Sequence, residues 1–217
     1  MGEIMKEYPH INGSSKAPHE PCVAFCKYDG SNLRFEWSKK RGFYKFGTRT
    51  RLFDKNDPVF GEAIEIFLNK YSEDLSKIFS DHKDYRNRGE AIAFCEFFGN
   101  KSFAGLHVKE DPKTVILFDI NIYKMGLLGP KEFLQNFGHL DVAEVVSYTN
   151  LNQEFINGIR DGIIQFESKK PIKNAVWEGV VCKSGKSHDL WMVKIKTNAY
   201  RDALNKHYAT DWLKYWE

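Results

Sequence analysis

The sequence lacks the features that mark a disulfide-bonded, zinc-binding or membrane-spanning protein. Its four cysteines form no C-x-x-C pair and lie mostly within apolar runs, which predicts reduced, buried thiols in an intracellular protein. The longest apolar stretch, residues 115–122, is interrupted by Asp119 and Asn121 and is far shorter than a bilayer span. The first residues are charged and contain no apolar signal core. We therefore expect a cytoplasmic protein with no membrane partner.

Strong net charge and low-complexity sequence are also absent. The formal net charge of the 217 residues is +3, which is too small by itself to indicate nucleic acid. Positive charge is nevertheless concentrated, because residues 16–51 contain nine Lys and Arg against three Asp and Glu. That excess suits a phosphate-rich partner, and a solvated basic hairpin explains it equally well. With 42% hydrophobic residues and no repeat or linker, residues 1–217 are expected to form one domain.

The hydrophobic pattern predicts strands and helices in mixed order. Residues 1–21 are expected to be an irregular lead-in because of their prolines and their Asn-Gly-Ser-Ser stretch. Strands are expected over residues 23–27, 32–37, 43–48, 89–98, 115–123, 141–148, 176–183 and 190–196. Helices are expected over residues 58–70 (with Asp57 as N-cap), 72–79, 130–137, 152–166 and 198–217. This order favours an α+β fold with mainly antiparallel sheets flanked by helices.

Residues 25–34 place a lysine at the end of an apolar run, directly before an Asp-Gly turn. Asp29-Gly30 separates two alternating runs, which is a strong local signal for a hairpin-like turn. Lys27 is therefore predicted to lie at a rigid strand end, facing the cavity that the turn borders. An isolated lysine beside such a turn is most often a solvated side chain, so the rest of the chain must decide.

Two glutamates each end an apolar strand face. Alternation places Glu96 at the end of one such face, and it places Glu178 on the same face as Val180 and Cys182. A carboxylate in that position is costly to bury unless it has a hydrogen-bond or metal partner. Either glutamate, taken alone, is also consistent with a strand end that reaches water.

A pair of lysines and an aromatic residue complete the set of candidates. Lys194 and Lys196 alternate with core residues, so their ammonium groups lie about 7 Å apart on one side of a strand. Such a pair can bind consecutive phosphates, and it is also a common device against aggregation on edge strands. Phe118 is a candidate for stacking on a base, with ordinary core packing as the alternative.

Together, these segments resemble, in order, the motifs of the covalent nucleotidyltransferases, which include DNA ligases, RNA ligases and mRNA capping enzymes. Lys27-Tyr28-Asp29-Gly30-Ser31-Asn32 is similar to motif I, and residues 92–99, 115–120, 177–183 and 191–196 are similar to motifs III, IIIa, IV and V. The resemblance implies that Lys27 carries the nucleotide and that Glu178 helps to hold a divalent ion through water. The implied nucleotide-binding residues are Asp29, Gly30, Asn32, Arg49 (with Arg51 as the alternative), Glu96 for the ribose, Phe118 for the purine, Glu178, Lys194 and Lys196.

The motif details favour one branch of this superfamily. DNA ligases usually carry an arginine where this chain has Asn32. At this position, and at residues 96–99 and 102–105, the sequence resembles the RNA ligase 2 branch more closely. Residues 197–217 alone follow motif V, so the resemblance implies a ligase-type nucleotidyltransferase domain with no C-terminal oligonucleotide-binding (OB) domain. A partner protein would be one source of that domain. Cys26 departs from related RNA ligases, in which a glutamate often reads the adenine amine.

The resemblance implies an ATP-dependent RNA ligase that uses Mg²⁺ or Mn²⁺. Such an enzyme forms a lysyl-AMP, transfers AMP to the 5′-phosphate of a nucleic-acid end, with nicked RNA duplex as the favoured substrate, and seals that end to a 3′-hydroxyl. A free lysine has a pKa near ~10.4, so Lys194, Lys196 and a metal ion are expected to help Lys27 lose its proton. Two alternatives stay open. The first is a minimal DNA ligase or capping-type guanylyltransferase, and the second is a catalytically inactive nucleic-acid-binding module.

Overall fold

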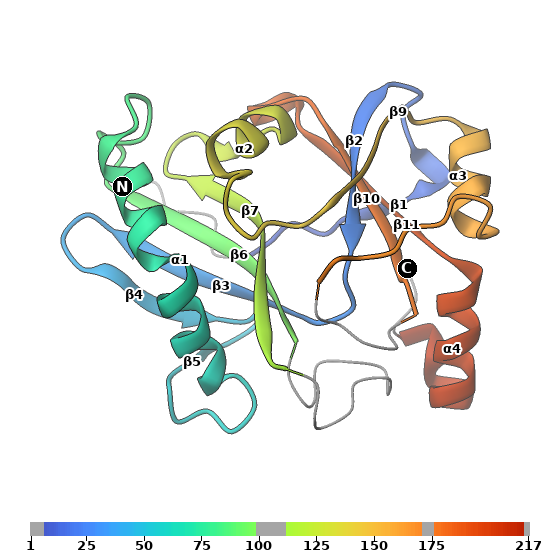
Figure 1. Ribbon diagram of the computed structural model, residues 1–217, viewed down its shortest axis with the longest axis horizontal. Helices are drawn as coiled ribbons and strands as arrows, with labels where there is room; N and C mark the ends of the chain where they lie inside the picture. The colour runs from blue at the N-terminus through green and yellow to red at the C-terminus, as the bar shows by residue number, and fades with distance from the viewer. Residues whose placement is uncertain (1–6, 99–111, 171–175, 215–217) are drawn as a thin grey trace.

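The computed structural model describes residues 7–98, 112–170 and 176–214, which form two β-sheets with four α-helices around them (Figure 1). The first sheet has the strand order β1-β11-β10-β2-β9, and the second has the order β5-β4-β3-β6-β7-β8. Within the described ranges, the named strands pair antiparallel except for β1 with β11. The predicted α+β fold with mainly antiparallel sheets is therefore confirmed.

The element bounds are as follows. The first sheet consists of β1 (Asn12–Gly13), β2 (Pro21–Lys27), β9 (Val145–Asn150), β10 (Gly179–Ser184) and β11 (Trp191–Lys196). The second sheet consists of β3 (Ser31–Ser38), β4 (Gly42–Gly47), β5 (Leu52–Phe53), β6 (Glu90–Phe98), β7 (Thr114–Ile122) and β8 (Gly126–Leu127). The helices are α1 (Gly61–Asp81), α2 (Pro130–Phe137), α3 (Gln153–Arg160) and α4 (Asn198–Tyr208).

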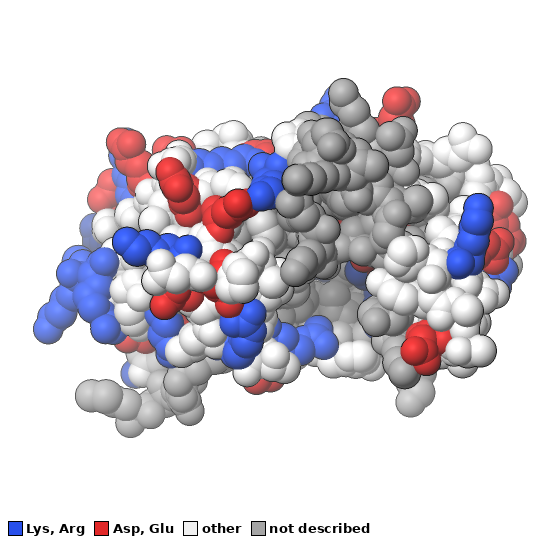
Figure 2. Space-filling model, turned by 90° about the horizontal axis from the view of Figure 1, so that it is seen from below, with Lys and Arg blue, Asp and Glu red and all other residues white. Residues whose placement is uncertain are grey.

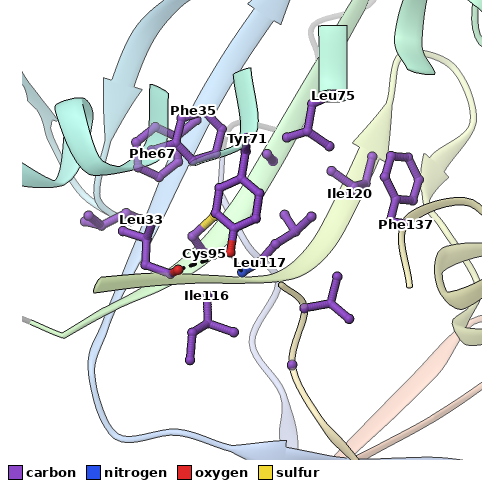
Figure 3. Packing of buried hydrophobic residues seen from close by; sticks show 14 of the residues in the cluster. Leu33, Phe35, Phe67, Tyr71, Leu75, Cys95, Ile116, Leu117, Ile120 and Phe137 are labelled. Carbon is purple, nitrogen blue, oxygen red and sulfur yellow. Dashed lines mark hydrogen bonds between the residues drawn. The ribbon is translucent and has the colours of Figure 1, made fainter. Parts of the chain in front are cut away.

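Helix α1 covers one face of the second sheet and supplies much of the core (Figures 1 and 3). The ring of Phe67 stacks on Phe35 of β3, with ring centroids 3.7 Å apart. The Tyr71 hydroxyl donates to the carbonyl oxygen of Asp141 at 2.6 Å and accepts from the Leu117 amide at 3.3 Å. Each fully buried apolar side chain of this size contributes about 1.5–3 kcal/mol through its removal from water. This packing holds the second sheet as a rigid platform.

Helix α3 packs on the outer face of the first sheet. Its apolar side chains Phe155, Ile156 and Ile159 are buried against strands β10 and β11. The other face of this sheet, with Val23 and Phe25, joins the core of the second sheet. The face of the first sheet opposite α3 is therefore turned toward the second sheet.

Several predicted boundaries were wrong. The two helices expected over residues 58–70 and 72–79 are one continuous helix, α1, which begins at Gly61. Asp57 instead caps the preceding turn, where its Oδ1 accepts from the amides of Val59 and Phe60 at 2.9 Å each. Helix α3 stops at Arg160, ahead of Gly162 with a φ of +71°, and β9 begins at Val145. Helix α4 gives way to a 3₁₀ helix over residues 209–214.

The Asp29-Gly30 turn does not close a hairpin, which corrects the expectation drawn from the sequence. Strand β2 pairs with β9 and β10, whereas β3 pairs with β4 and β6. The Asp-Gly signal predicts a change of chain direction, but it does not specify which strands become neighbours. Here the chain crosses from the first sheet to the second at this turn. Lys27 therefore lies where the two sheets meet.

None of the helices in the described ranges is both long enough and apolar enough to cross a membrane.

Candidate active site

A cavity of about 510 Å³ lies between the two sheets. This volume is within the range of pockets that bind small organic ligands. Among the residues predicted from the sequence, its lining includes Lys27, Gly30, Asn32, Arg49, Glu96, Phe118, Lys194 and Lys196. The remaining two are Glu178, which contacts Lys27 directly, and Asp29, which follows Lys27 in the crossing turn. The structure thus brings all ten predicted residues to one place, although they lie far apart in the sequence.

The ammonium group of Lys27 is held by Glu178. Lys27 Nζ lies 2.8 Å from Glu178 Oε2, and Lys196 Nζ lies 3.2 Å from Glu178 Oε1. Only 3% of the Glu178 side chain is exposed, and a buried carboxylate is tolerated when both of its oxygens have charged partners. The Lys27 side chain is 23% exposed, so a ligand in the cavity can reach its amine.

Glycine at position 179 decides where Glu178 points. The predicted common face of Glu178, Val180 and Cys182 is wrong, because Val180 and Cys182 pack in the core with α3 while Glu178 contacts the cavity lysines. Gly179 has a φ of +140°, which interrupts the strand alternation and strains any other residue. An added Cβ would also lie 1.9 Å from the carbonyl oxygen of Ile195. The glycine is therefore required by both conformation and space.

A second glycine joins the crossing turn to the second sheet. The Gly30 amide donates to Glu96 Oε1 at 2.9 Å, and Asn32 lies opposite Glu96 in the pairing of β3 with β6. A Cβ on Gly30 would approach the carbonyl oxygen of Phe97 to 2.6 Å. The absence of a side chain thus lets the Lys27 turn approach the Glu96 strand closely.

The carboxyl groups around Lys27 have unusual pKa values. Burial, opposed by Lys27, raises the pKa of Glu96 to about 8, and burial together with Glu178 raises the pKa of Asp29 to about 7. For Lys27, burial is the largest single influence and lowers the pKa, but Glu178, Glu96 and Asp29 together outweigh it and raise the pKa. The expected lowering of the Lys27 pKa by Lys194 and Lys196 is therefore wrong, because the neighbouring carboxyl groups dominate. Glu178, whose oxygen lies 2.8 Å from the amine, is the first of the groups that keep Lys27 charged.

We predict that stability falls as pH rises from about 5 to about 8 because of Asp29 and Glu96. Unfolded carboxyls titrate near ~4, so their raised pKa values in the folded protein favour folding at low pH. This stabilisation is lost as pH rises through about 7 for Asp29 and about 8 for Glu96. Each pKa unit corresponds to about 1.4 kcal/mol of unfolding free energy. Urea unfolding at a series of pH values measures the slope of the unfolding free energy against pH.

The double variant Asp29→Asn/Glu96→Gln is the control for this pH prediction. It keeps the histidines and the other titrating groups, but it removes the two carboxyls. Its unfolding free energy should depend less on pH than that of the wild-type chain. Equal slopes for the two proteins would contradict the prediction.

The floor of the cavity contains an ion pair that sequence reasoning missed. Lys183 Nζ of β10 lies 2.6 Å from Asp119 Oδ2 of β7, and the Tyr8 hydroxyl donates to the same oxygen at 2.5 Å. The Lys183 and Asp119 side chains are 5% and 2% exposed. Lys183 and Asp119 both lie inside the motif-like segments, so strand alternation in those segments was the sequence signal that could have identified them as site residues. Tyr8 gave no signal, because it belongs to the irregular lead-in.

Phe118 lies beside this ion pair and presents part of its ring to the cavity. It is only partly buried, and the ring of Tyr8 packs edge-on against it with centroids 5.0 Å apart. Val181 also lines the cavity. The position therefore combines core packing with an aromatic surface that a flat ligand can contact.

The two candidate arginines have different surroundings. Arg49 is exposed and lines the cavity, whereas Arg51 pairs with Asp57 at 2.5 Å and lies over the Phe60 ring at 5.4 Å. Arg34 donates to the carbonyl oxygen of Thr48, which fixes the loop that carries Arg49. The geometry favours Arg49 over Arg51 as a ligand contact.

The residues of the cavity suit a divalent ion whose ligands are mainly water molecules and phosphate oxygens, with few protein carboxylates. Across the described ranges, no group of three or more His, Cys, Asp or Glu side chains is arranged to hold a metal. Both oxygens of Glu178 contact lysines, while Asp29 Oδ2 is buried without a hydrogen-bond partner among the described residues. Mg²⁺ prefers few carboxylates, several waters and phosphate oxygens, so one or two acids beside a phosphate site fit that preference.

The two facing sheets form a fold that is shared with solved RNA ligases. A Naegleria gruberi RNA ligase mutant, solved with ATP and Mn, is 20% identical, with a TM-score of 0.65, and covers 96% of this chain. The same ligase with PPi is 17% identical with a TM-score of 0.58, and an archaeal ATP-dependent RNA ligase is 19% identical with a TM-score of 0.56, covering 93% of this chain. No protein-family model and no curated protein matches the sequence.

The likeness extends over part of each neighbour. This chain spans 62% and 61% of the two Naegleria chains and 51% of the archaeal chain. At these identities the comparison shows the shared fold. Residues 102–105, which contribute to the sequence resemblance, lie outside the described residues.

Proposed function

We propose that this chain is the nucleotidyltransferase part of an ATP-dependent RNA ligase. One observation carries the proposal: the reachable amine of Lys27 lies in a cavity between two sheets, beside Glu178 and within the electrostatic reach of Glu96. An amine in such a place can act as a nucleophile toward a phosphate group. The fold likeness to RNA ligases supports this chemistry over other uses of a buried lysine.

The proposed roles follow from the position of each group in the cavity. Lys27 is the nucleophile, and Lys194, Lys196 and Arg49 lie where cationic groups can neutralise phosphates. Glu96, Gly30 and Asn32 would contact the ribose side, while Phe118 would stack on the purine. Asp29 and Glu178 would lie beside Mg²⁺ or Mn²⁺ and its water shell.

The first step would exchange one bond to phosphorus for another. After its ammonium group has released a proton to solvent, Lys27 Nζ would attack the α-phosphorus of ATP; an N–P bond forms, the bond to the bridging oxygen breaks, and pyrophosphate leaves. A divalent cation held beside Asp29 and Glu178 would supply positive charge that offsets the carboxylates. Because those carboxylates raise the pKa of Lys27, offsetting them favours the neutral amine. AMP would then pass to a 5′-phosphate and be released when a 3′-hydroxyl attacks.

The alternatives differ in substrate or in class. A capping-type guanylyltransferase would take GTP, and a minimal DNA ligase would join DNA. Cys26, buried beside Lys27, provides no carboxylate to read the adenine amine, so backbone groups would have to select ATP. A catalytically inactive nucleic-acid-binding module is disfavoured by the reachable Lys27 amine and by the charged groups around it. A partner protein that extends the nucleic-acid surface remains part of the proposal.

Labelling with α-phosphate-labelled nucleotide tests the proposal directly. We expect covalent label from ATP in the presence of Mg²⁺ or Mn²⁺, stable to denaturation of the protein and labile to acid, as a phosphoramidate bond requires. Label from GTP alone would support the guanylyltransferase. The absence of label from both nucleotides would support the inactive binding module. Sealing of nicked duplexes with RNA or DNA strands then identifies the joined substrate.

A further inference from the structure

The tip of the β3–β4 hairpin carries a cluster of exposed positive charge outside the cavity. Lys39, Lys40 and Arg41 form this tip, and all three are exposed. Figure 2 shows Lys and Arg side chains gathered at the end of the molecule where this hairpin turns in Figure 1. The Lys39 amide donates to the carbonyl oxygen of Gly89 at 3.0 Å, which brings the exposed segment 86–88 to the same end. We call Lys39, Lys40 and Arg41 the hairpin tip.

The charge of the hairpin tip is not cancelled by acids of the same hairpin. The acidic residue of the β3–β4 segment, Glu36, is buried and is already engaged by Arg34 at 3.2 Å and by Lys45 at 3.3 Å. The Arg41 guanidinium lies 3.5 Å from the centroid of the Tyr44 ring, which restrains its orientation. The tip therefore offers Lys39 and Lys40 as exposed cations beside an Arg41 whose guanidinium lies on the Tyr44 ring of the same hairpin.

The hairpin connects this tip with the cavity. Strand β4 ends at Gly47, two residues before Arg49 at the cavity, and its other end at Gly42 adjoins the tip. Six strand residues at about 3.3 Å each span roughly 20 Å. Each strand of a duplex advances about 3.4 Å along the helix axis per nucleotide, so roughly six nucleotides of a duplex that lies along the hairpin cover that distance. The spacing suits a strand that has one end in the cavity and its backbone along the hairpin.

We propose that the hairpin tip binds backbone phosphates of the nucleic acid, roughly six nucleotides from the end that the cavity processes. The inference rests on the proposed ligase function and adds a binding surface to it. Lysine and arginine contacts of this kind position the strand without reading its sequence. They also make affinity depend on salt, because each neutralised phosphate releases counterions.

The test compares two variants that lose the same charge. Lys39→Ala/Lys40→Ala removes two cations from the tip, and Lys131→Ala/Lys186→Ala removes two exposed cations from α2 and from the β10–β11 turn. Binding is measured with a nicked RNA duplex, 5′-phosphorylated at the nick, at several salt concentrations. The tip variant should bind several-fold more weakly, and its slope of log affinity against log salt should be smaller by about 1–2. The control variant should match the wild-type chain.

Three results decide the proposal. An unchanged salt slope in the tip variant, or an equal loss in the control variant, would overturn it. Shortening one flank of the duplex below roughly six nucleotides should remove the difference between wild type and tip variant, and no effect from either flank would overturn it. Covalent labelling by ATP should be the same in all three proteins. Loss of label from the wild-type chain would count against the proposed function, whereas intact label without duplex binding would count against this surface alone.

Discussion

Lys27→Ala should abolish covalent labelling by ATP, because Lys27 is the proposed nucleophile and two other amines near it are held by buried acids. Lys196 Nζ is bound to Glu178 Oε1, and its side chain is 6% exposed compared with 23% for Lys27. Lys183 is bound to Asp119 at the floor. The reaction needs an amine in line with the leaving pyrophosphate, so the loss should be complete and not a reduction in rate.

Lys27→Arg is the control that separates chemistry from folding. Arginine keeps a positive charge beside Glu178, but its guanidinium stays protonated and cannot act as the nucleophile. We expect this variant to unfold at nearly the wild-type urea concentration and to carry no label. Acid-labile label on Lys27→Arg would show that another residue is the nucleophile. If Lys27→Arg does not fold, Lys27→Met replaces it, and binding of unlabelled ATP by Lys27→Met shows whether its site is intact.

Lys183→Met should produce a large loss of stability. The variant leaves Asp119 charged and 2% exposed, with the Tyr8 hydroxyl as its remaining side-chain partner. Breaking a buried ion pair from one side costs about 3–5 kcal/mol of unfolding free energy. Urea unfolding followed by tryptophan fluorescence measures the change.

The double variant Lys183→Met/Asp119→Asn tests the cause of that loss. Removing the second charge should restore much of the stability, because no isolated ion is then buried. A double-mutant cycle with Asp119→Asn alone gives the coupling between the two residues. Additive losses would show that the pair does not interact and that Lys183 acts through packing.

The sequence was sufficient to predict most strands, and the reason is local. Strand alternation is a property of neighbouring residues, so β6, β7 and β11 could be predicted within one or two residues. The path between sheets was not predictable in this way. The Asp29-Gly30 turn has the same signal whether the next strand pairs back or joins another sheet, and tertiary packing decided the outcome.

The candidate site was predicted as a set of residues, and its electrostatics were not. Motif-like segments placed Lys27, Glu96 and Glu178 together, but the direction of the Glu178 side chain depends on the positive φ of Gly179. The sign of the Lys27 pKa shift depends on the balance of burial against three carboxylates. Such a balance is set by distances across the fold, which residue spacing does not contain.

The construction of the cavity from both sheets also has a consequence for protein synthesis. Lys27 and Asn32 are made first, Glu96 and Phe118 later, and Lys194 and Lys196 last among the residues that line the cavity. A nascent chain that has not yet been extended past residue 196 lacks two of the cavity cations. Nucleotide can bind the finished cavity only after residues 27–196 have been made and folded, so shorter nascent chains should not sequester it.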